Sequence, residues 1–405
     1  MENTTRHGGA SGRTPPHLVT LVLLAGLSAM AVNVFLPSLP GIAAHFDTDY
    51  QLVQLSVATY LAASGVLQIF IGPLADRFGR RPILLISIAI FLVATLGCIF
   101  APSFKAFLFF RVIQASIATA TALSRAAVRD MFEGDKAAAT MGYVTMGMSM
   151  VPMFAPAIGG VLDDIFGWQA SFWLLLIFGC AIFALTWIDL GETAKPSSLS
   201  ILRQFAEYPE LLTSPRFWGY CMAAALSSGA YFAYLGGAPF VATQVYGLSP
   251  AQFGLLNAAA GLGYFVGNGI TGRFTMQIGM NRMIILGSCI ITGGMALSLT
   301  LAYAGVPGYA AFFGPIVFVG IGNGMTIPAA STGMLSVRPH LAGTASGLGG
   351  AMMIGGGACL SALAGSMLAP GTGHFPLTWL MFFCGVGGII AITAVKRRER
   401  KLMGS

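Results

Sequence analysis

Residues 72–82 read Gly-Pro-Leu-Ala-Asp-Arg-Phe-Gly-Arg-Arg-Pro, and they join two long apolar stretches of the chain. Arginines concentrated in so short a connection indicate a cytoplasmic loop, because Lys and Arg collect on that side of a membrane. Gly79 permits a tight turn, and Gly72 permits a close approach between helices. This stretch therefore predicts a chain that crosses a membrane and turns back at the cytoplasmic surface.

The composition agrees with a membrane protein. Of the 405 residues, 56% are hydrophobic and 9% are charged, whereas soluble domains carry about 25% charged residues. A helix needs about 20 apolar residues to cross the hydrocarbon core, and the stretches lack the alternation of a membrane β-barrel. The chain offers twelve such stretches, near residues 18–42, 51–74, 83–101, 104–128, 137–162, 168–188, 217–245, 250–272, 283–304, 309–336, 341–368 and 376–395.

The basic residues predict the orientation of the helices. With a cytoplasmic N-terminus, all of the 21 basic residues except Lys105 and Arg111 lie on the cytoplasmic side. The net charge of +7 therefore reflects membrane topology, and we expect no nucleic-acid partner. Both termini are expected in the cytoplasm of a bacterium, with the chain in its inner membrane.

A polar stretch, residues 189–216, separates six spans from six spans, which is the layout of parallel-repeat transporters. A weak repeat pairs Arg77-Phe78 with Arg273-Phe274, and Arg81 with Arg282. We expect an all-α membrane protein made of a cytoplasmic tail (1–17), a six-helix half (18–188), a cytoplasmic linker (189–216), a second six-helix half (217–395) and a basic cytoplasmic tail (396–405).

No signature of an enzyme or of a cofactor site stands out. The six cysteines lie in apolar stretches without metal or redox spacing. The sequence contains no ATP-binding P-loop and no nucleophile–base constellation. We therefore expect neither a cofactor nor a metal.

Three motifs carry a family resemblance. Residues 72–82 resemble motif A of the major facilitator superfamily, Arg111 to Ala115 resemble motif B, and residues 155–160 resemble motif C of its antiporter branch, with Ala155 in place of the first glycine. The resemblance implies the major facilitator fold of twelve helices. It implies a conformational switch at Gly72, Asp76, Arg77, Gly79, Arg80, Arg129 and Asp130, and a helix kink at Pro156, Gly159 and Gly160.

Residues 36–40 and 124–130 narrow the resemblance to the Bcr/CflA group of drug-resistance transporters. That group exports antibiotics and some small metabolites in exchange for protons. Its members usually carry an aspartate in span 1, where this chain has Asn33, and all 14 carboxylates lie outside the apolar spans. Because an amide does not titrate near neutral pH, we expect weak or absent direct proton coupling.

Arg111 is the one charge deep within a span, and such charges mark functional sites. A rise of 1.5 Å per residue puts Arg111 and Asn33 at similar depths, so they could meet across one central cavity. The alternative is an arginine that snorkels to the surface. The other polar or aromatic candidates for substrate binding are Gln114, Tyr60, Tyr231, Tyr234, Asn257 and Tyr264.

We therefore predict a monomeric secondary transporter in the lipid bilayer that exports small amphipathic molecules, including drugs, by alternating access. Protons remain a candidate coupling ion. The main alternative is a facilitator or exchanger of a small anionic or zwitterionic metabolite bound by Arg111. A transporter-like receptor or an intramembrane enzyme fits less well, because the sequence has no sizeable soluble domain and no catalytic groups.

Overall fold

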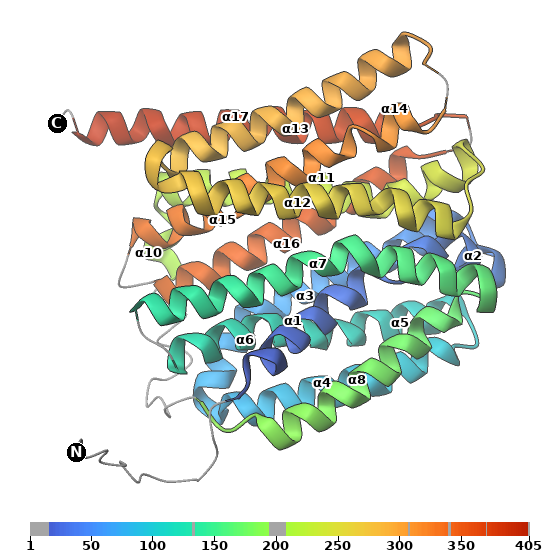
Figure 1. Cartoon of the computed structure of the whole chain (residues 1–405), viewed down its shortest axis with the longest axis horizontal. Helices are drawn as coiled ribbons and strands as arrows, with labels where there is room; N and C mark the ends of the chain where they lie inside the picture. Colours follow the sequence, from blue (N-terminus) through green and yellow to red (C-terminus); the bar gives the residue numbers. More distant parts are fainter. Residues whose placement is uncertain are drawn as a thin grey trace, which may run out of the picture.

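A computed structural model describes residues 16–131, 134–193, 208–306, 308–338, 342–369 and 371–403. Within these ranges the chain is helical and contains no strand. The long helices lie side by side in two groups, with the first half of the chain below and the second half above in Figure 1. This is the expected architecture of twelve membrane-crossing helices in two six-helix halves.

The first half contains the following elements: α1 (Leu18–Asn33), η1 (Leu36–Ser38), α2 (Leu39–His45), α3 (Tyr50–Phe78), α4 (Arg80–Ile99), α5 (Phe104–Gln114), η2 (Ala115–Ile117), α6 (Ala118–Met131), α7 (Gly134–Phe166) and α8 (Gln169–Asp189). The second half contains α10 (Tyr208–Leu212), α11 (Pro215–Phe240), η3 (Val241–Val245), α12 (Pro250–Ile278), α13 (Met280–Tyr303), α14 (Ala310–Phe313), α15 (Ile316–Val337), α16 (Ala342–Met367) and α17 (Phe375–Met403).

Nine helical segments of the described chain are long and apolar enough to cross a membrane. The long helices α7, α11 and α12 complete the set of twelve. Both α11 and α12 are glycine-rich and carry polar side chains in their middle turns. They are therefore less apolar, but they offer small residues for close packing between helices.

Two of the twelve expected spans are each divided into shorter helical segments and are not continuous helices. The first ends at Asn33 and resumes through η1 and α2, because Pro37 and Pro40 remove backbone donors at these positions. The fourth is divided into α5 and α6 by the three residues of η2. A third difference is that α17 continues through the expected basic tail as far as Met403.

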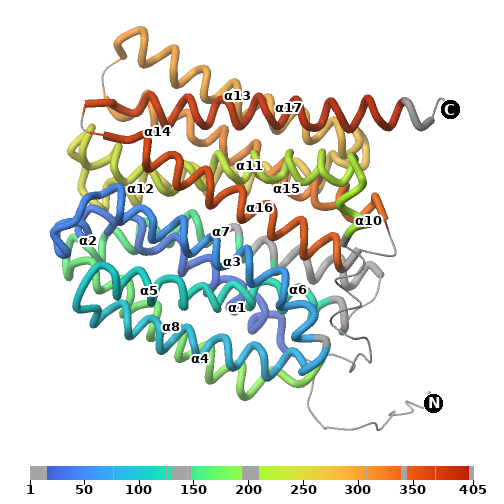
Figure 2. The backbone as a smooth tube through the Cα atoms, turned by 180° about the vertical axis from the view of Figure 1, so that it is seen from behind, coloured from blue at the N-terminus to red at the C-terminus, as the bar shows by residue number. Residues whose placement is uncertain are grey.

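The two halves meet along α7 with α12, which lie at the front of Figure 1, and along α3 with α16, which lie at the front of Figure 2. Figure 2 shows the bundle from behind. Glycines bring the backbones together: an added Cβ at Gly254 would clash with the carbonyl of Pro156, and one at Gly261 would clash with Met153.

The turn after α3 has a structural counterpart after α12. Gly79 adopts φ 92° and ψ 151°, and Gly279 adopts φ 84° and ψ 149°. These positive φ angles favour glycine. The repeat expected from Arg77-Phe78 and Arg273-Phe274 is therefore out of register, since Arg273 lies about one helical turn before the place that matches Arg77.

Candidate functional site

Asn33 joins the two halves in the middle of the bundle. It is the last residue of α1, and its side chain is 4% exposed. The hydroxyl of Tyr231, on α11, donates to Asn33 Oδ1 at 3.3 Å, while Asn33 Nδ2 donates to the carbonyl of Ala29 at 2.8 Å. A neutral polar pair thus links the first helix of each half, the position expected of a substrate site in this fold.

Arg111 lies fully buried behind this pair. Its Nη1 atom donates to the carbonyl of Ala31 at 3.4 Å and to Oε1 of Gln114. The guanidinium carbon lies 4.0 Å from the ring centroid of Phe35 and 4.5 Å from that of Tyr60. With 0% exposure, Arg111 does not snorkel to the surface.

The described contacts of Arg111 all come from the first half of the chain. They reach α1, α3, α5 and, through Phe172 with its ring centroid at 6.0 Å, α8. No direct hydrogen bond between Arg111 and Asn33 is found in this part of the structure. Arg111 instead supports the end of α1 through Ala31 and Phe35, on either side of Asn33.

The other predicted binding residues fall into separate groups. Gln114 donates to Thr95 Oγ1 at 2.7 Å and belongs to the Arg111 cluster. Tyr234 stacks on Tyr231, with ring centroids 6.4 Å apart. Asn257 donates to the carbonyl of Pro152 across the halves at 3.3 Å. Tyr264 lies further along α12, is partly exposed, and is close enough to Tyr231 for the two side chains to interact electrostatically.

The turn of motif A is bound to the end of α8. The backbone N–H of Arg80 donates to Oε1 of Glu192 at 2.9 Å, and that of Arg81 donates to Oε2 at 3.3 Å. Arg81 Nε also donates to the carbonyl of Leu190 at 2.8 Å. Glu192 therefore occupies the N-terminus of α4, where a carboxylate is favoured.

Three members of the predicted switch cannot be placed, because the side chains of Asp76, Arg129 and Asp130 lie outside the described residues. Arg77 is exposed. The close approach expected at Gly72 is not found, since no described atom lies within 4 Å of an added Cβ.

Gly79→Ala is expected to reduce transport about tenfold or more, because a methyl group would clash with the Glu192 carboxylate at a left-handed turn. The measurement is substrate transport per amount of folded protein in the membrane. Gly279→Ala is the matched control, since its φ is similar but no atom of the described residues lies within 4 Å of the added Cβ. Equal losses in both variants would assign the effect to the turn alone and contradict a role for Glu192.

Motif C, residues 155–160 on α7, lies where α7 closely approaches the backbone of neighbouring segments. An added Cβ at Gly159 would clash with the carbonyl of Val34, and one at Gly160 would clash with the carbonyl of Pro250. The first contact lies within the first half, and the second crosses to α12. Both Pro152 and Pro156 lie inside the continuous helix α7. The expected kink stays a prediction, but the glycines thin the packing surface of α7.

Asp163 and Asp164 lie at the predicted outer end of α7, and Asp164 extends the contact between α7 and α12. Asp164 Oδ2 accepts from Ser249 Oγ at 3.1 Å and from the N–H of Ala251 at 3.3 Å, so it caps α12 across the two halves. Burial, and secondly the charge of Asp164, raise the pKa of Asp163 to about 6. Asp163 lies just beyond the predicted span 137–162. The predicted outer side is closed in this structure.

Closure of the outer side is expected to weaken as the pH rises through about 6, because Asp163 binds its proton more tightly when buried than in water. Between about pH 4 and pH 6 the buried carboxyl remains protonated while an exposed one ionises, so acid favours the closed form. The measurement is the distance between spin labels on the outer ends of α7 and α12 as the pH is changed. Asp163→Asn should remove this dependence, and Asp49→Asn serves as the control.

Sequence reasoning missed several contacts across the halves. Gln54 Nε2, on α3, donates to the carbonyl of Ser361 at 3.1 Å, and Gln51 Nε2 donates to that of Leu368 at 2.9 Å. Gln54 could have been found, because a glutamine in an apolar span needs buried partners. Nothing in the sequence indicates that Asp164 and Glu192 cap helices distant in the chain.

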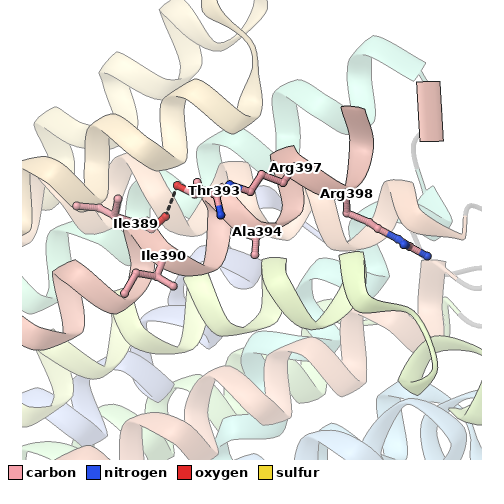
Figure 3. A pocket seen from close by; sticks show the side chains of 6 residues that line it. All are labelled: Ile389, Ile390, Thr393, Ala394, Arg397 and Arg398. Atoms are coloured by element: carbon pink, nitrogen blue, oxygen red, sulfur yellow. Dashed lines mark hydrogen bonds between the residues drawn. The ribbon is translucent and has the colours of Figure 1, made fainter. Parts of the chain in front are cut away.

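Two surface hollows lie away from this site. One, of about 440 Å³, is lined on α17 by Ile389, Ile390, Thr393, Ala394, Arg397 and Arg398 (Figure 3). The other, of about 480 Å³, lies between α2 and η3 and is lined by Pro40, Ala43, Ala44, Asp47, Thr48, Asp49 and Gln244. Among the residues that the structure describes, no group of His, Cys, Asp or Glu could hold a metal ion.

Known proteins resemble this chain over most of its length. The uncharacterised MFS-type transporter YdgK of Bacillus subtilis (strain 168) is 32% identical over 386 residues, which cover 94% of this chain and 95% of YdgK. The chloramphenicol resistance protein of Pseudomonas aeruginosa is 30% identical and covers 78% of this chain and 76% of its own. The multidrug resistance protein D of Escherichia coli (strain K12) is 27% identical, with 91% and 93% covered.

Solved structures share the fold at low sequence identity. A D-xylose-proton symporter superimposes with a TM-score of 0.75 at 16% identity, covering 93% of this chain and 96% of its own. A peptide transporter in complex with sulfate superimposes with a TM-score of 0.77 at 13% identity, covering 95% and 94%.

The profile of the Major Facilitator Superfamily matches residues 21–362, which include both halves and the contacts between them. The chain is therefore a multi-pass membrane transporter, not an enzyme, and it belongs to the Major Facilitator Superfamily.

Proposed function

We propose that this protein is a secondary transporter that exports small amphipathic molecules, drugs among them, by alternating access. The observation that carries the proposal is the hydrogen bond from Tyr231 to Asn33, which joins the halves in the middle of the bundle. The names of the chloramphenicol and multidrug resistance relatives support this class of substrate. We place the protein as a monomer in a bacterial inner membrane, with both termini in the cytoplasm.

In this proposal the substrate binds between Asn33 and the aromatic face of α11 formed by Tyr231 and Tyr234. Aromatic side chains with polar tips suit flat, partly apolar solutes. Asn257 offers a further polar atom, since its Oδ1 has no hydrogen-bond partner among the described residues, and Tyr60 offers a hydroxyl. Arg111 acts on the site as a positioning residue through the end of α1.

The experiment is uptake of radiolabelled chloramphenicol into inside-out membrane vesicles. Tyr231→Phe removes the hydroxyl that bonds Asn33 and should lower uptake about tenfold, since a buried acceptor loses its partner. Tyr309→Phe is the matched control, because Tyr309 is 45% exposed on the surface. Equal uptake by vesicles that lack the protein, or unchanged uptake by the Tyr231→Phe variant, would refute the proposal.

The energy source is proposed to be the substrate gradient or exchange rather than direct proton coupling, because Asn33 stands where an acid is expected and all carboxylates lie outside the spans predicted from the sequence. In proteoliposomes Asn33→Asp should introduce pH dependence, since it places an acid near Arg111. The test solute must keep one charge state over the pH range used. Strong uphill transport by the wild-type protein under a pH gradient alone would contradict this.

A further inference from the structure

The charge around the proposed substrate site is positive and uncompensated. All 14 carboxylates lie outside the predicted spans, and Arg111 is fully buried within one. Its contacts are with neutral groups: the carbonyl of Ala31, the amide of Gln114 and the rings of Phe35 and Tyr60. No ion pair of Arg111 occurs within the described chain, and its Nε and Nη2 atoms have no hydrogen-bond partner there.

This charge lies directly behind the residues of the site. Ala31, which accepts from Arg111, is two residues before Asn33, and Phe35, which covers the guanidinium, is two residues after it. Asn33 and Tyr231 are themselves neutral, so nothing in the pair offsets the field of Arg111. Inside the bundle that field is screened far less than in water.

We infer that the site between Asn33 and Tyr231 accepts neutral and anionic aromatic amphiphiles and rejects permanent cations of the same size and shape. This inference rests on the proposed function and narrows its substrate class. For two unit charges about 10 Å apart at an effective dielectric constant of about 20, repulsion lowers affinity roughly tenfold, and this is the penalty expected for a cationic ligand. An anion gains affinity by the same interaction.

The experiment compares three probes that share one aromatic core: 4-nitrobenzamide (neutral), 4-nitrobenzoate (anionic) and 4-nitrobenzyltrimethylammonium (cationic). Binding of each to the purified full-length protein is measured by titration calorimetry. The wild-type protein should bind the neutral and anionic probes at least about tenfold more tightly than the cation. Equal or tighter binding of the cation, or no binding of any probe, would overturn the inference.

A single substitution should reverse the preference. Asn33→Asp adds a carboxylate at the site and should raise affinity for the cationic probe about tenfold while lowering that for the anion. Gln244→Glu is the matched control, because it makes the same amide-to-carboxylate change at an exposed position on η3. An unchanged preference in Asn33→Asp, in a variant that elutes as folded protein, contradicts the inference.

Chloramphenicol uptake into vesicles tests the proposed function separately. If uptake occurs but the cation binds as tightly as the neutral probe, export stands and the substrate class proposed here is wrong. If the probes show the expected order but no uptake occurs, the site selects by charge and the export proposal fails.

Discussion

Arg111→Ala is expected to lower drug export about a hundredfold, the largest loss of any substitution considered. The guanidinium is fully buried, donates to Ala31 and Gln114, and lies against the rings of Phe35 and Tyr60. Alanine leaves a cavity and two unpaired acceptors, the carbonyl of Ala31 on α1 and Oε1 of Gln114 on α5, each costing about 1–3 kcal/mol. Export is measured in cells and normalised to folded protein in the membrane.

Arg111→Lys separates charge from geometry. It keeps the positive charge but loses the planar group that lies between the two rings, so we expect export to fall about tenfold. Arg282→Ala is the control, because Arg282 is exposed. Wild-type export in both Arg111 variants would show that the residue is only an anchor.

Gly160→Val is expected to prevent closure of the predicted outer side and to reduce export more than tenfold. The new side chain would clash with the backbone of Pro250 and Ala251 on α12, which cannot move away as a flexible side chain can. Spin labels on the outer ends of α7 and α12 should move apart by several ångströms, because the two halves separate there. The protein should still insert in the membrane, since the clash lies between the halves and not within one.

Gly272→Val on α12 is the matched control for Gly160→Val. No described atom lies within 4 Å of an added Cβ at Gly272. This variant should export at close to the wild-type rate. An unchanged label distance in Gly160→Val would mean that the contact with Pro250 does not hold the outer side closed.

The fold could be predicted because it depends on properties local in the sequence. The length of the apolar stretches predicts the spans, and the placement of the arginines predicts their orientation in the membrane. The glycine of motif A at position 79 predicts a tight turn, which has a positive φ in the structure. The breaks after Asn33 and around η2 were missed. Pro37 and Pro40 could have indicated the first break, because each removes a backbone donor, whereas residues 115–117 contain no proline or glycine that marks the second.

The contacts of the candidate site residues follow from the sequence only in part. The sequence singled out Asn33, Tyr231 and Arg111 because polar groups in hydrocarbon need partners, and their role in substrate binding stays a prediction. Which partner each one takes depends on helix rotation, which the sequence does not specify. Arg111 therefore faces α1, α3 and α8 within its own half, and Tyr231 is the residue that bonds Asn33. For the same reason the sequence does not indicate that Asp164 caps α12.

The central claim is that Asn33 and Tyr231 together form the substrate site between the halves. A double-mutant cycle in chloramphenicol binding to the purified protein tests it most directly, with Asn33→Ala, Tyr231→Phe and the double variant. The account predicts that each single change lowers affinity about tenfold and that the double variant binds no more weakly than either, because both remove one shared interaction. Unchanged affinity in the single variants, or fully additive losses in the double variant, would contradict it.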